Sequence, residues 1–290
     1  MKIGLLDIDS KIANLALMKI SAYHKSIGDS VKWHDPLFDK PDRVYASKIF
    51  TFTPDYDCAF PNCEIVKGGT GYDITSKLPE EIENIQPDYS IYPNCKSAIG
   101  FLTRGCIRKC SWCIVPEKEG NIHAVSVWQQ VKRNDSNEII FLDNNVLACQ
   151  HGINQIIELG NQKVRIDFNQ GLDARLIDSF VAELLCRCKW MRFIRISCDS
   201  QSMIEPVKKA VKYIRFIKPN QEIFCYVLVK DVVESLNIVE ELRKINVTPF
   251  AQSYRDFSVE DKRTQEQIRF CVWVNRKEKF KSCKFENYKG

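Results

Sequence analysis

Three cysteines lie close together in the middle of the 290-residue chain, and their spacing is C-x-x-x-C-x-x-C. They are Cys106, Cys110 and Cys113, in the segment GFLTRGCIRKCSWCIVPEKEG at residues 100–120. Three thiolates on one loop are close enough to surround a single inorganic cluster, and thiolate is the ligand that holds iron-sulfur clusters. Because a cubane cluster needs four ligands, this triplet would leave one iron open to a substrate or a cofactor.

The surroundings of the triplet favour a cluster over zinc. Arg104, Arg108 and Lys109 would offset the negative charge of a thiolate-bound cluster and help to keep the cysteines deprotonated. The alternative is a zinc knuckle with His123 as the fourth ligand, in a zinc-stabilised protein that binds nucleic acid. Zinc motifs usually pair two C-x-x-C units, whereas this sequence has one asymmetric triplet. We therefore expect an iron-sulfur site.

A regular alternation of strands and helices from residue 97 onward would position the triplet. Helical patterns, with apolar residues every three or four positions, cover residues 124–133, 146–159, 174–187, 202–217 and 232–244. The strand candidates are Ala98–Leu102, Glu138–Leu142, Val164–Phe168, Phe193–Ser197, Ile223–Val229 and Val247–Phe250. Such units predict a parallel sheet covered by helices and curled into a partial (β/α)6 TIM-like barrel over residues 96–257.

Polar side chains recur where these strands end, and in such barrels the carboxyl ends of the strands carry the functional residues. They are Asp143, Asn144 and Asn145 after the second strand, Asn169, Gln170 and Arg175 after the third, Ser197, Cys198, Asp199 and Ser200 at the fourth, and Gln252 and Tyr254 at the sixth. Each could also cap a helix or form a turn. This alternative applies most to Asp143 and Asp199, because N-capping is the usual role of an aspartate before a helix.

The first 95 residues predict a small Rossmann-like α/β domain. Its expected elements are a strand at Lys2–Asp7, a helix over residues 12–27 that ends at Gly28, and short strands at Val31–Trp33, Val44–Ser47 and Glu64–Val66. The GGTG loop at residues 68–71 could bring backbone amides to a phosphate, although a glycine cluster after a strand is more often a turn. A short helix and a linker between Pro79 and Pro93 predict the boundary with the barrel.

Trp112 stands just before the third cysteine, and the triplet follows the first strand of a six-unit series, so the sequence resembles the radical SAM superfamily. The N-terminal α/β unit with its GGTG loop is similar to the cobalamin-binding-type group, which includes methyltransferases and methylthiotransferases. The resemblance covers nearly the whole chain, and its specific part is residues 100–120. The Asp-x-His-x-x-Gly motif of base-off cobalamin proteins is absent, since none of the four histidines stands in that context. The group can bind cobalamin without that motif, so cobalamin remains open.

The resemblance implies a 4Fe-4S cluster on the three cysteines, with S-adenosylmethionine on its open iron. One electron, from a donor such as a flavodoxin or ferredoxin, would cleave the sulfonium and give a 5′-deoxyadenosyl radical for hydrogen abstraction or for methyl or sulfur transfer. The resemblance also implies that Asp143 faces the ammonium of S-adenosylmethionine and that Asp199 faces its ribose. The cofactor-binding candidates are Trp112, Asp143, Asn144, Gln170, Arg175 and Asp199. RNA, protein and small-molecule substrates all remain open.

Composition places the chain among ordinary folded proteins, with 44% hydrophobic and 27% charged residues. No apolar run reaches the ~18 residues that span a membrane. Acidic residues interrupt the N-terminus MKIGLLDIDSK where a signal peptide would be apolar, so we expect a cytoplasmic protein that does not enter a membrane.

Thirteen cysteines without an export signal favour reduced thiols over disulfides. Most of them, including Cys149, Cys198 and Cys225, lie in apolar patterns and are expected to be buried. The only other set that could hold a cluster is loosely spaced and consists of Cys58, Cys63 and Cys95.

Positive charge is concentrated at the C-terminal end. Residues 261–290 hold nine Lys and Arg against four acids, a surplus of five, which equals the net charge of +5 of the whole chain. This basic extension, residues 258–290, could bind RNA, or it could be a solvated helix face, because no aromatic-basic recognition motif accompanies it. Its apolar residues are expected to pack on the barrel, and they are Phe270, Val272, Trp273, Val274 and Phe280.

Overall fold

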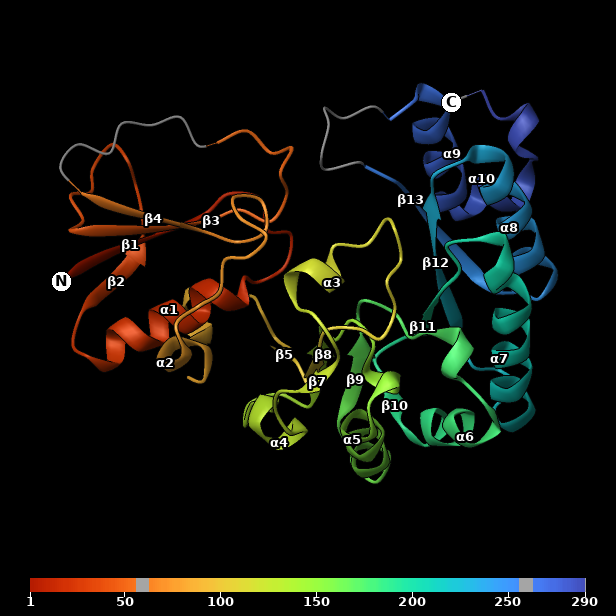
Figure 1. The fold of residues 1–290 in the computed structure, drawn as a ribbon, viewed down its shortest axis with the longest axis horizontal. Helices are drawn as coiled ribbons and strands as arrows, with labels where there is room; N and C mark the ends of the chain where they lie inside the picture. The colour runs from red at the N-terminus through yellow and green to blue at the C-terminus, as the bar shows by residue number, and fades with distance from the viewer. Residues whose placement is uncertain (56–62, 256–262, 290) are drawn as a thin grey trace. The chain divides into compact units, whose positions relative to one another are not determined.

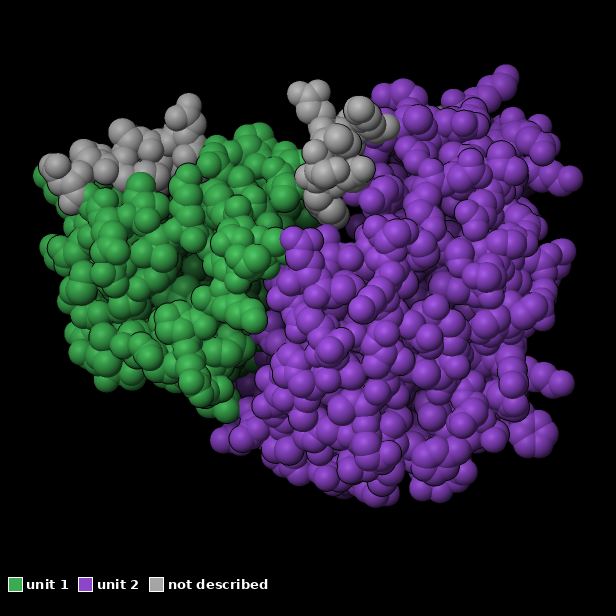
Figure 2. Space-filling view, in the orientation of Figure 1, with its two compact units in different colours: residues 1–96 green, residues 97–290 purple. Residues whose placement is uncertain are grey.

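The computed structural model describes residues 1–55, 63–255 and 263–289. The chain divides into two compact units, residues 1–96 and residues 97–290, which Figure 2 shows in green and purple. Both are mixed α/β units built on parallel sheets, which confirms the expected α/β class. Within the described ranges, no helix has both the length and the apolar character needed to cross a membrane.

The first unit contains a four-stranded parallel sheet with the strand order β2-β1-β3-β4. The strands are β1 (Lys2–Asp7), β2 (Ser30–Trp33), β3 (Arg43–Ser47) and β4 (Glu64–Gly68). Helix α1 (Leu15–Ser26) is N-capped by Asn14 and stops before Gly28, whose φ of +87° ends the helix as expected. Apolar residues of α1 and of the short α2 (Glu80–Glu83) pack with those of β1. A 3-10 turn, η1 (Tyr89–Ile91), follows α2.

The GGTG loop packs closely against another segment of the first unit. Lys48 N donates to Gly68 O at 3.1 Å, and Gly71 N donates to Lys48 O at 2.9 Å. Gly69 has a φ of +93°, and a Cβ atom there would lie 2.5 Å from Lys48 O. The glycines are therefore explained by a left-handed backbone and by the approach of two backbone segments, which is the turn alternative.

The second unit contains two parallel sheets, with the strand orders β10-β9-β8-β5 and β11-β12-β13. The strands are β5 (Ala98–Gly100), β8 (Glu138–Phe141), β9 (Arg165–Phe168), β10 (Lys189–Trp190), β11 (Ile194–Ser197), β12 (Ile223–Val229) and β13 (Thr248–Ser253). A parallel bridge between Leu172 and Ile196 connects the chain after β9 with β11. The carboxyl ends of the six longer strands therefore share one side of the unit.

Four helices cover these sheets: α5 (Gln150–Gly160), α6 (Ser179–Arg187), α7 (Ile204–Ile217) and α8 (Val232–Lys244). Figure 1 shows α7 and α8 on the same side of β12. Alternate residues of β12 are buried, and their apolar side chains join those of the helices in one core. The burial of Cys198 and Cys225 in this core is as expected, whereas Cys149 is only half-buried.

Of the four covering helices, α8 has the bounds that the sequence pattern predicts, and the others begin later than predicted. Three of them are preceded by 3-10 turns, which are η2 (Val146–Ala148), η3 (Ala174–Leu176) and η4 (Gln201–Met203). The expected helix over residues 124–133 is wrong in its first half, because only α4 (Trp128–Val131) is helical. Instead β7 (His123–Ala124) pairs antiparallel with β6 (Thr103–Arg104), a contact between distant parts of the sequence that a local pattern cannot reveal.

The described part of the C-terminal extension, residues 263–289, packs on the second unit. Its elements are α9 (Gln265–Asn275), α10 (Lys277–Ser282) and the 3-10 turn η5 (Phe285–Asn287). The Asn275 side chain hydrogen-bonds both backbone groups of Ala251 in β13 at 2.8 Å, and Gln267 Nε2 donates to the carbonyl oxygens of Val229 (3.3 Å) and Lys230 (3.0 Å). Of the expected apolar contacts, all are buried except half-buried Val272. Residues 258–262 of the extension, like Cys58, lie outside the described residues.

Candidate functional site

The three cysteines belong to a loop between β6 and β7, residues 105–120, which we call the cysteine loop. It contains one short helix, α3 (Val115–Lys118). Its two ends meet where Cys106 N donates to Gly120 O at 3.2 Å and where Gly105 N donates to Glu119 Oε2 at 3.0 Å. Gly105 has a φ of +80°, and a Cβ atom there would lie 2.3 Å from the carbonyl oxygen of Asn121. Only glycine fits at position 105, where the two ends of the cysteine loop meet.

The thiols share one polar environment. Cys106 Sγ accepts hydrogen bonds from Arg108 N (3.3 Å) and from the side-chain amide of Asn145 (3.4 Å). Cys113 is exposed on one side, but burial by the surrounding atoms raises the pKa of its thiol, and the charges of Cys110 and Cys106 add to this rise. Because N–H donors stabilise a sulfur ligand, Arg108 N and Asn145 Nδ2 would support Cys106 in holding a metal or a cluster.

Asp143, at the end of β8, binds the chain that enters the cysteine loop. Its carboxylate is buried and accepts hydrogen bonds from Thr103 N (2.6 Å), Thr103 Oγ1 (2.7 Å) and Leu102 N (3.1 Å). Burial raises the pKa of Asp143 to about 6, although these hydrogen bonds act in the opposite direction. The helix-cap alternative is wrong for Asp143, because η2 begins three residues later, with Asn145 at the N-cap position. The carboxylate holds the backbone of residues 102–103 instead.

The two asparagines after Asp143 also contact the cysteine loop. Asn144 Nδ2 donates to Glu119 Oε2 at 2.6 Å, next to the bond from Gly105. Asn145 Nδ2 donates to Cys106 Sγ, while its Oδ1 atom is buried and accepts no hydrogen bond from the described residues. A buried acceptor without a donor is unfavourable for folding and can be satisfied by a water molecule, an ion or a ligand.

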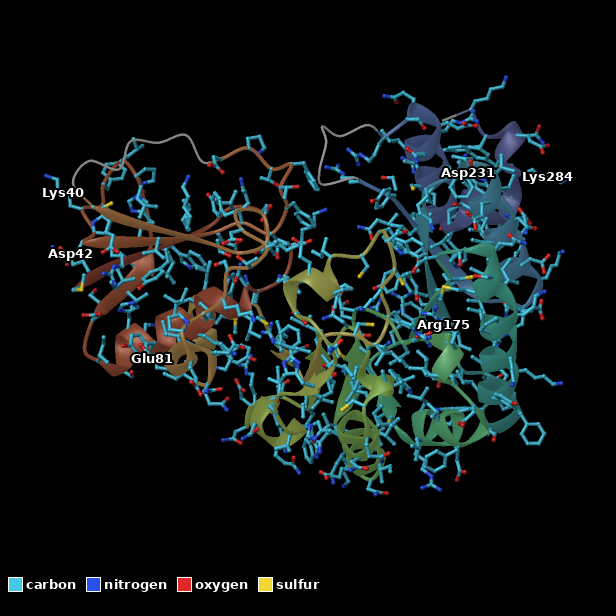
Figure 3. The ribbon with its side chains drawn as sticks, in the orientation of Figure 1. Lys40, Asp42, Glu81, Arg175, Asp231 and Lys284 are labelled. Carbon is cyan, nitrogen blue, oxygen red and sulfur yellow. The ribbon has the colours of Figure 1, made fainter. Side chains whose placement is uncertain are left out.

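Asp173, after β9, is a residue that the sequence analysis missed. Its buried carboxylate accepts from Arg175 Nε (2.7 Å) and Nη2 (3.0 Å) and from Arg108 Nε (3.1 Å) of the cysteine loop. Asp173 raises the pKa of the Arg175 guanidinium, and the nearby thiols of Cys110 and Cys106 add to this effect. Arg175, labelled in Figure 3, therefore lies near two of the three candidate ligands. The only sequence signal for Asp173 was its place two residues before Arg175.

Asp199 and Trp112 lie near the ends of β11 and β12. Asp199 Oδ1 accepts from Leu228 N at 3.1 Å, and burial raises the pKa of Asp199, while the charges of Lys230 and Arg175 lower it. The charge of Asp199 also affects the Cys113 thiol, so the two groups are close. Asp199 does not cap η4, because Ser200 occupies its N-cap position. Lys230, a second residue that sequence analysis missed, places its amine 3.4 Å from the centre of the Trp112 ring.

The remaining strand-end candidates do not belong to the group of residues around the cysteine loop. Gln170 and Gln252 are exposed, and neither forms a hydrogen bond with the cysteine loop among the described residues. Asn169 contributes its carbonyl oxygen to a 2.8 Å hydrogen bond from the Tyr226 hydroxyl, and Cys198 is buried in the core. The sequence could not separate these residues from the others, because all of them follow a strand.

The sulfur atoms that would hold a metal ion or a cluster lie in the cysteine loop. The three thiols and the Arg108 N–H group belong to this loop, whereas the second N–H group directed at Cys106 Sγ and the buried Oδ1 atom belong to Asn145, after β8. In the parts of the chain that the structure describes, no three His, Cys, Asp or Glu side chains are arranged as a ready metal site. His123 is exposed on β7, and its Nδ1 atom lies 3.0 Å from Asn121 O.

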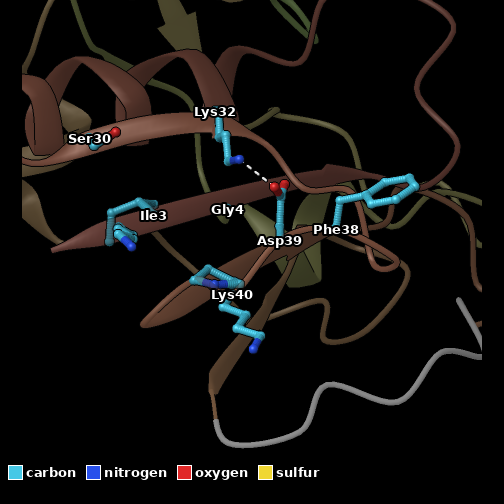
Figure 4. Close-up of a pocket in the computed structure, with 9 residues that line it drawn as sticks. Ile3, Gly4, Ser30, Lys32, Phe38, Asp39 and Lys40 are labelled. Carbon is cyan, nitrogen blue, oxygen red and sulfur yellow. Dashed lines mark hydrogen bonds and ion pairs between the residues drawn. The ribbon is translucent and has the colours of Figure 1, made fainter.

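The first unit has a pocket of its own, of about 450 Å³, between β1, β2 and residues 38–41 (Figure 4). Lys32 and Asp39 form an ion pair there, and Lys40 also lines the pocket. Phe38 is 82% exposed at its edge. None of the residues expected to bind a cofactor lines this pocket.

Comparison with models of known protein families gives no match, and comparison with curated proteins gives none either.

Proposed function

We propose that this protein is a radical SAM enzyme that holds a 4Fe-4S cluster on Cys106, Cys110 and Cys113. The observation that carries the proposal is the attachment of the cysteine loop to the carboxyl ends of several parallel strands. Asn145 binds it after β8, Asp173 after β9 and Lys230 after β12. Strand ends of parallel α/β units are the usual place for a cofactor and its substrate.

The six longer parallel strands support the further inference that the second unit is a partial (β/α)6 barrel. Their order along the sequence is also their order in the two sheets, and the bridge between Leu172 and Ile196 links the sheets. For the first unit we propose a Rossmann-like domain from its strand order. We propose no cobalamin site there, because packing against Lys48 accounts for the GGTG loop.

Each residue near the proposed cluster would have a separate role. The N–H groups on Cys106 Sγ stabilise the thiolate, and hydrogen bonds to sulfur influence the reduction potential of a bound cluster. When bound with S-adenosylmethionine, such a cluster supplies the electron that cleaves the sulfonium and yields a 5′-deoxyadenosyl radical. Asn145 Oδ1 is an acceptor that an ammonium group would satisfy, and the Asp199 carboxylate suits paired ribose hydroxyls. Asp143 acts through residues 102–103 and is a positioning residue.

The proposal is tested first by metal analysis of anaerobically purified protein. Wild type should contain iron and acid-labile sulfide, and Cys106→Ala, Cys110→Ala and Cys113→Ala should each lose both, because two thiolates are too few to hold the cluster. Cys149→Ala is the matched control, since Cys149 is a half-buried cysteine of the same unit and should leave the iron content unchanged.

The second step is incubation of the reduced protein with S-adenosylmethionine under anaerobic conditions. Formation of 5′-deoxyadenosine would support radical cleavage, and S-adenosylhomocysteine would indicate methyl transfer. Zinc without sulfide in the wild type, or equal iron in the triplet variants, would contradict the proposal and favour the zinc-stabilised alternative.

A further inference from the structure

The C-terminal helices present an unusual concentration of positive charge. We define the basic C-terminal surface as the exposed cations of residues 276–289, which are Arg276, Lys277, Lys279, Lys281, Lys284 and Lys289. The acids in this stretch are Glu278 and Glu286, so its net charge is +4. Figure 3 shows Lys284 at the edge of the second unit.

These six cations form no ion pair with the described residues, whereas some other surface cations of the same unit are paired. Lys208 on α7 binds Glu205 at 2.9 Å and Glu241 at 2.8 Å, and Arg187 on α6 binds Glu183. A paired lysine has much of its charge neutralised, whereas the basic C-terminal surface keeps its charge available to a ligand.

The backbone beneath the cations is held in place by aromatic packing. The ring of Trp273 lies 5.0 Å from that of Phe280 and 5.5 Å from that of Phe285, and all three are buried. Trp273 Nε1 donates to Cys283 O at 3.1 Å, and Arg243 of α8 donates to Phe280 O at 2.6 Å. The backbone that carries the cations is therefore ordered before a ligand arrives, which lowers the entropy that binding must overcome.

The composition of the basic C-terminal surface indicates which kind of partner it can bind. A helix that lies on a membrane needs an exposed apolar face, and a protein interface usually has an aromatic or apolar centre. No large hydrophobic residue of the described segment 263–289 is exposed, because its aromatic side chains face the core. Phosphodiester backbones are bound by cations alone, without contacts to the bases.

We propose that the basic C-terminal surface binds the phosphodiester backbone of a nucleic acid without reading its sequence. The inference goes beyond the proposed function, because it names a class of partner and does not depend on the cluster. It can be tested with the full chain free of iron, and Cys106→Ala should bind equally well. Failure of nucleic-acid binding would leave the iron analysis unaffected, and the reverse also holds.

The experiment measures fluorescence anisotropy of labelled 20-nucleotide RNA and DNA strands at 50 to 200 mM KCl. With about six phosphate contacts and about 0.7 counterions released per contact on a single strand, the affinity should fall about 300-fold across this range. Lys277→Gln/Lys281→Gln/Lys284→Gln should roughly halve the slope of log affinity against log salt. The matched control, Arg187→Gln/Lys208→Gln/Lys244→Gln, changes the net charge equally but removes paired cations, and it should keep the wild-type slope.

Three outcomes would overturn the proposal. The first is equal loss of binding in the two triple variants, which would indicate a general effect of net charge. The second is the absence of a salt-dependent interaction with either strand. The third is tighter binding to phosphatidylserine vesicles than to nucleic acid, which would indicate a lipid surface as the partner. Circular dichroism of both variants should match that of the wild type, because all the substituted side chains of the surface are exposed.

Discussion

Replacement of Asp143 by alanine should destabilise the protein, and the loss should depend on pH. The substitution leaves the buried N–H groups of Leu102 and Thr103 and the Thr103 hydroxyl without their acceptor. A buried polar group without a partner costs about 1–3 kcal/mol, so the two N–H groups alone represent roughly 2–6 kcal/mol. Part of this is offset at neutral pH, because alanine also removes a buried charge.

The size of that offset follows from the pKa of Asp143. Burial raises this pKa from 3.8 to about 6, so ionisation of the carboxyl destabilises the folded state as the pH rises from about 4 to above 6. The full shift corresponds to roughly 3 kcal/mol, of which about half has appeared by pH 5. Wild type is therefore more stable relative to Asp143→Ala at acidic pH, and the difference in unfolding free energy between the two proteins should be about 1.5 kcal/mol greater at pH 5 than at pH 8.

Urea denaturation at both pH values gives the two differences directly. Thr103→Val is the control, because it removes one hydroxyl donor to Asp143 but keeps both backbone bonds, and it should cost about 1 kcal/mol. An Asp143→Ala protein as stable as the wild type at both pH values, with weaker binding of S-adenosylmethionine, would refute this reasoning. It would mean that the carboxylate acts on the cofactor and not on the cysteine loop.

Two further predictions concern the cysteine loop. Gly105→Ala should lower the free energy of unfolding by about 2–4 kcal/mol, because its φ is +80° and its Cβ would lie 2.3 Å from Asn121 O. Gly120→Ala has a similar φ of +72° but open space around it, so thermal denaturation should show a loss of only about 1 kcal/mol, and equal losses would contradict the packing argument. Lys230→Met should remove about 0.5–2 kcal/mol of cation–π attraction to Trp112 and speed proteolysis of the loop. Lys230→Arg should keep the cysteine loop as resistant to proteolysis as it is in the wild type. Faster proteolysis in both variants would show that the contact with the Trp112 ring is unimportant.

Local sequence patterns were sufficient to predict elements that depend on neighbouring residues or on a run of apolar residues. The strand at Ile223–Val229 has the bounds that the sequence predicts, because seven apolar residues between turn signals form a buried parallel strand. The helix end at Gly28 was equally readable, since glycine is the residue that accepts a φ of +87°. The cysteine triplet was visible from spacing alone.

Contacts between distant residues were not readable in this way. The β7 pairing that shortens the expected helix at residues 124–133 joins segments 20 residues apart, and helical periodicity does not report it. Asp173 and Lys230 are important because they contact side chains of the cysteine loop, and a single sequence does not reveal such contacts. Asp143 was singled out for its position, but the atoms it binds could be named only from the fold.

Helix α9 is connected to the cysteine loop through a series of direct contacts that begins at Gln267. Gln267 holds the carbonyl oxygens of Val229 and Lys230, and the Lys230 amine rests on the ring of Trp112 beside Cys113. The hydrogen bond from Gln267 therefore limits the movement of the Lys230 backbone, and with it the position of the Lys230 amine on the Trp112 ring.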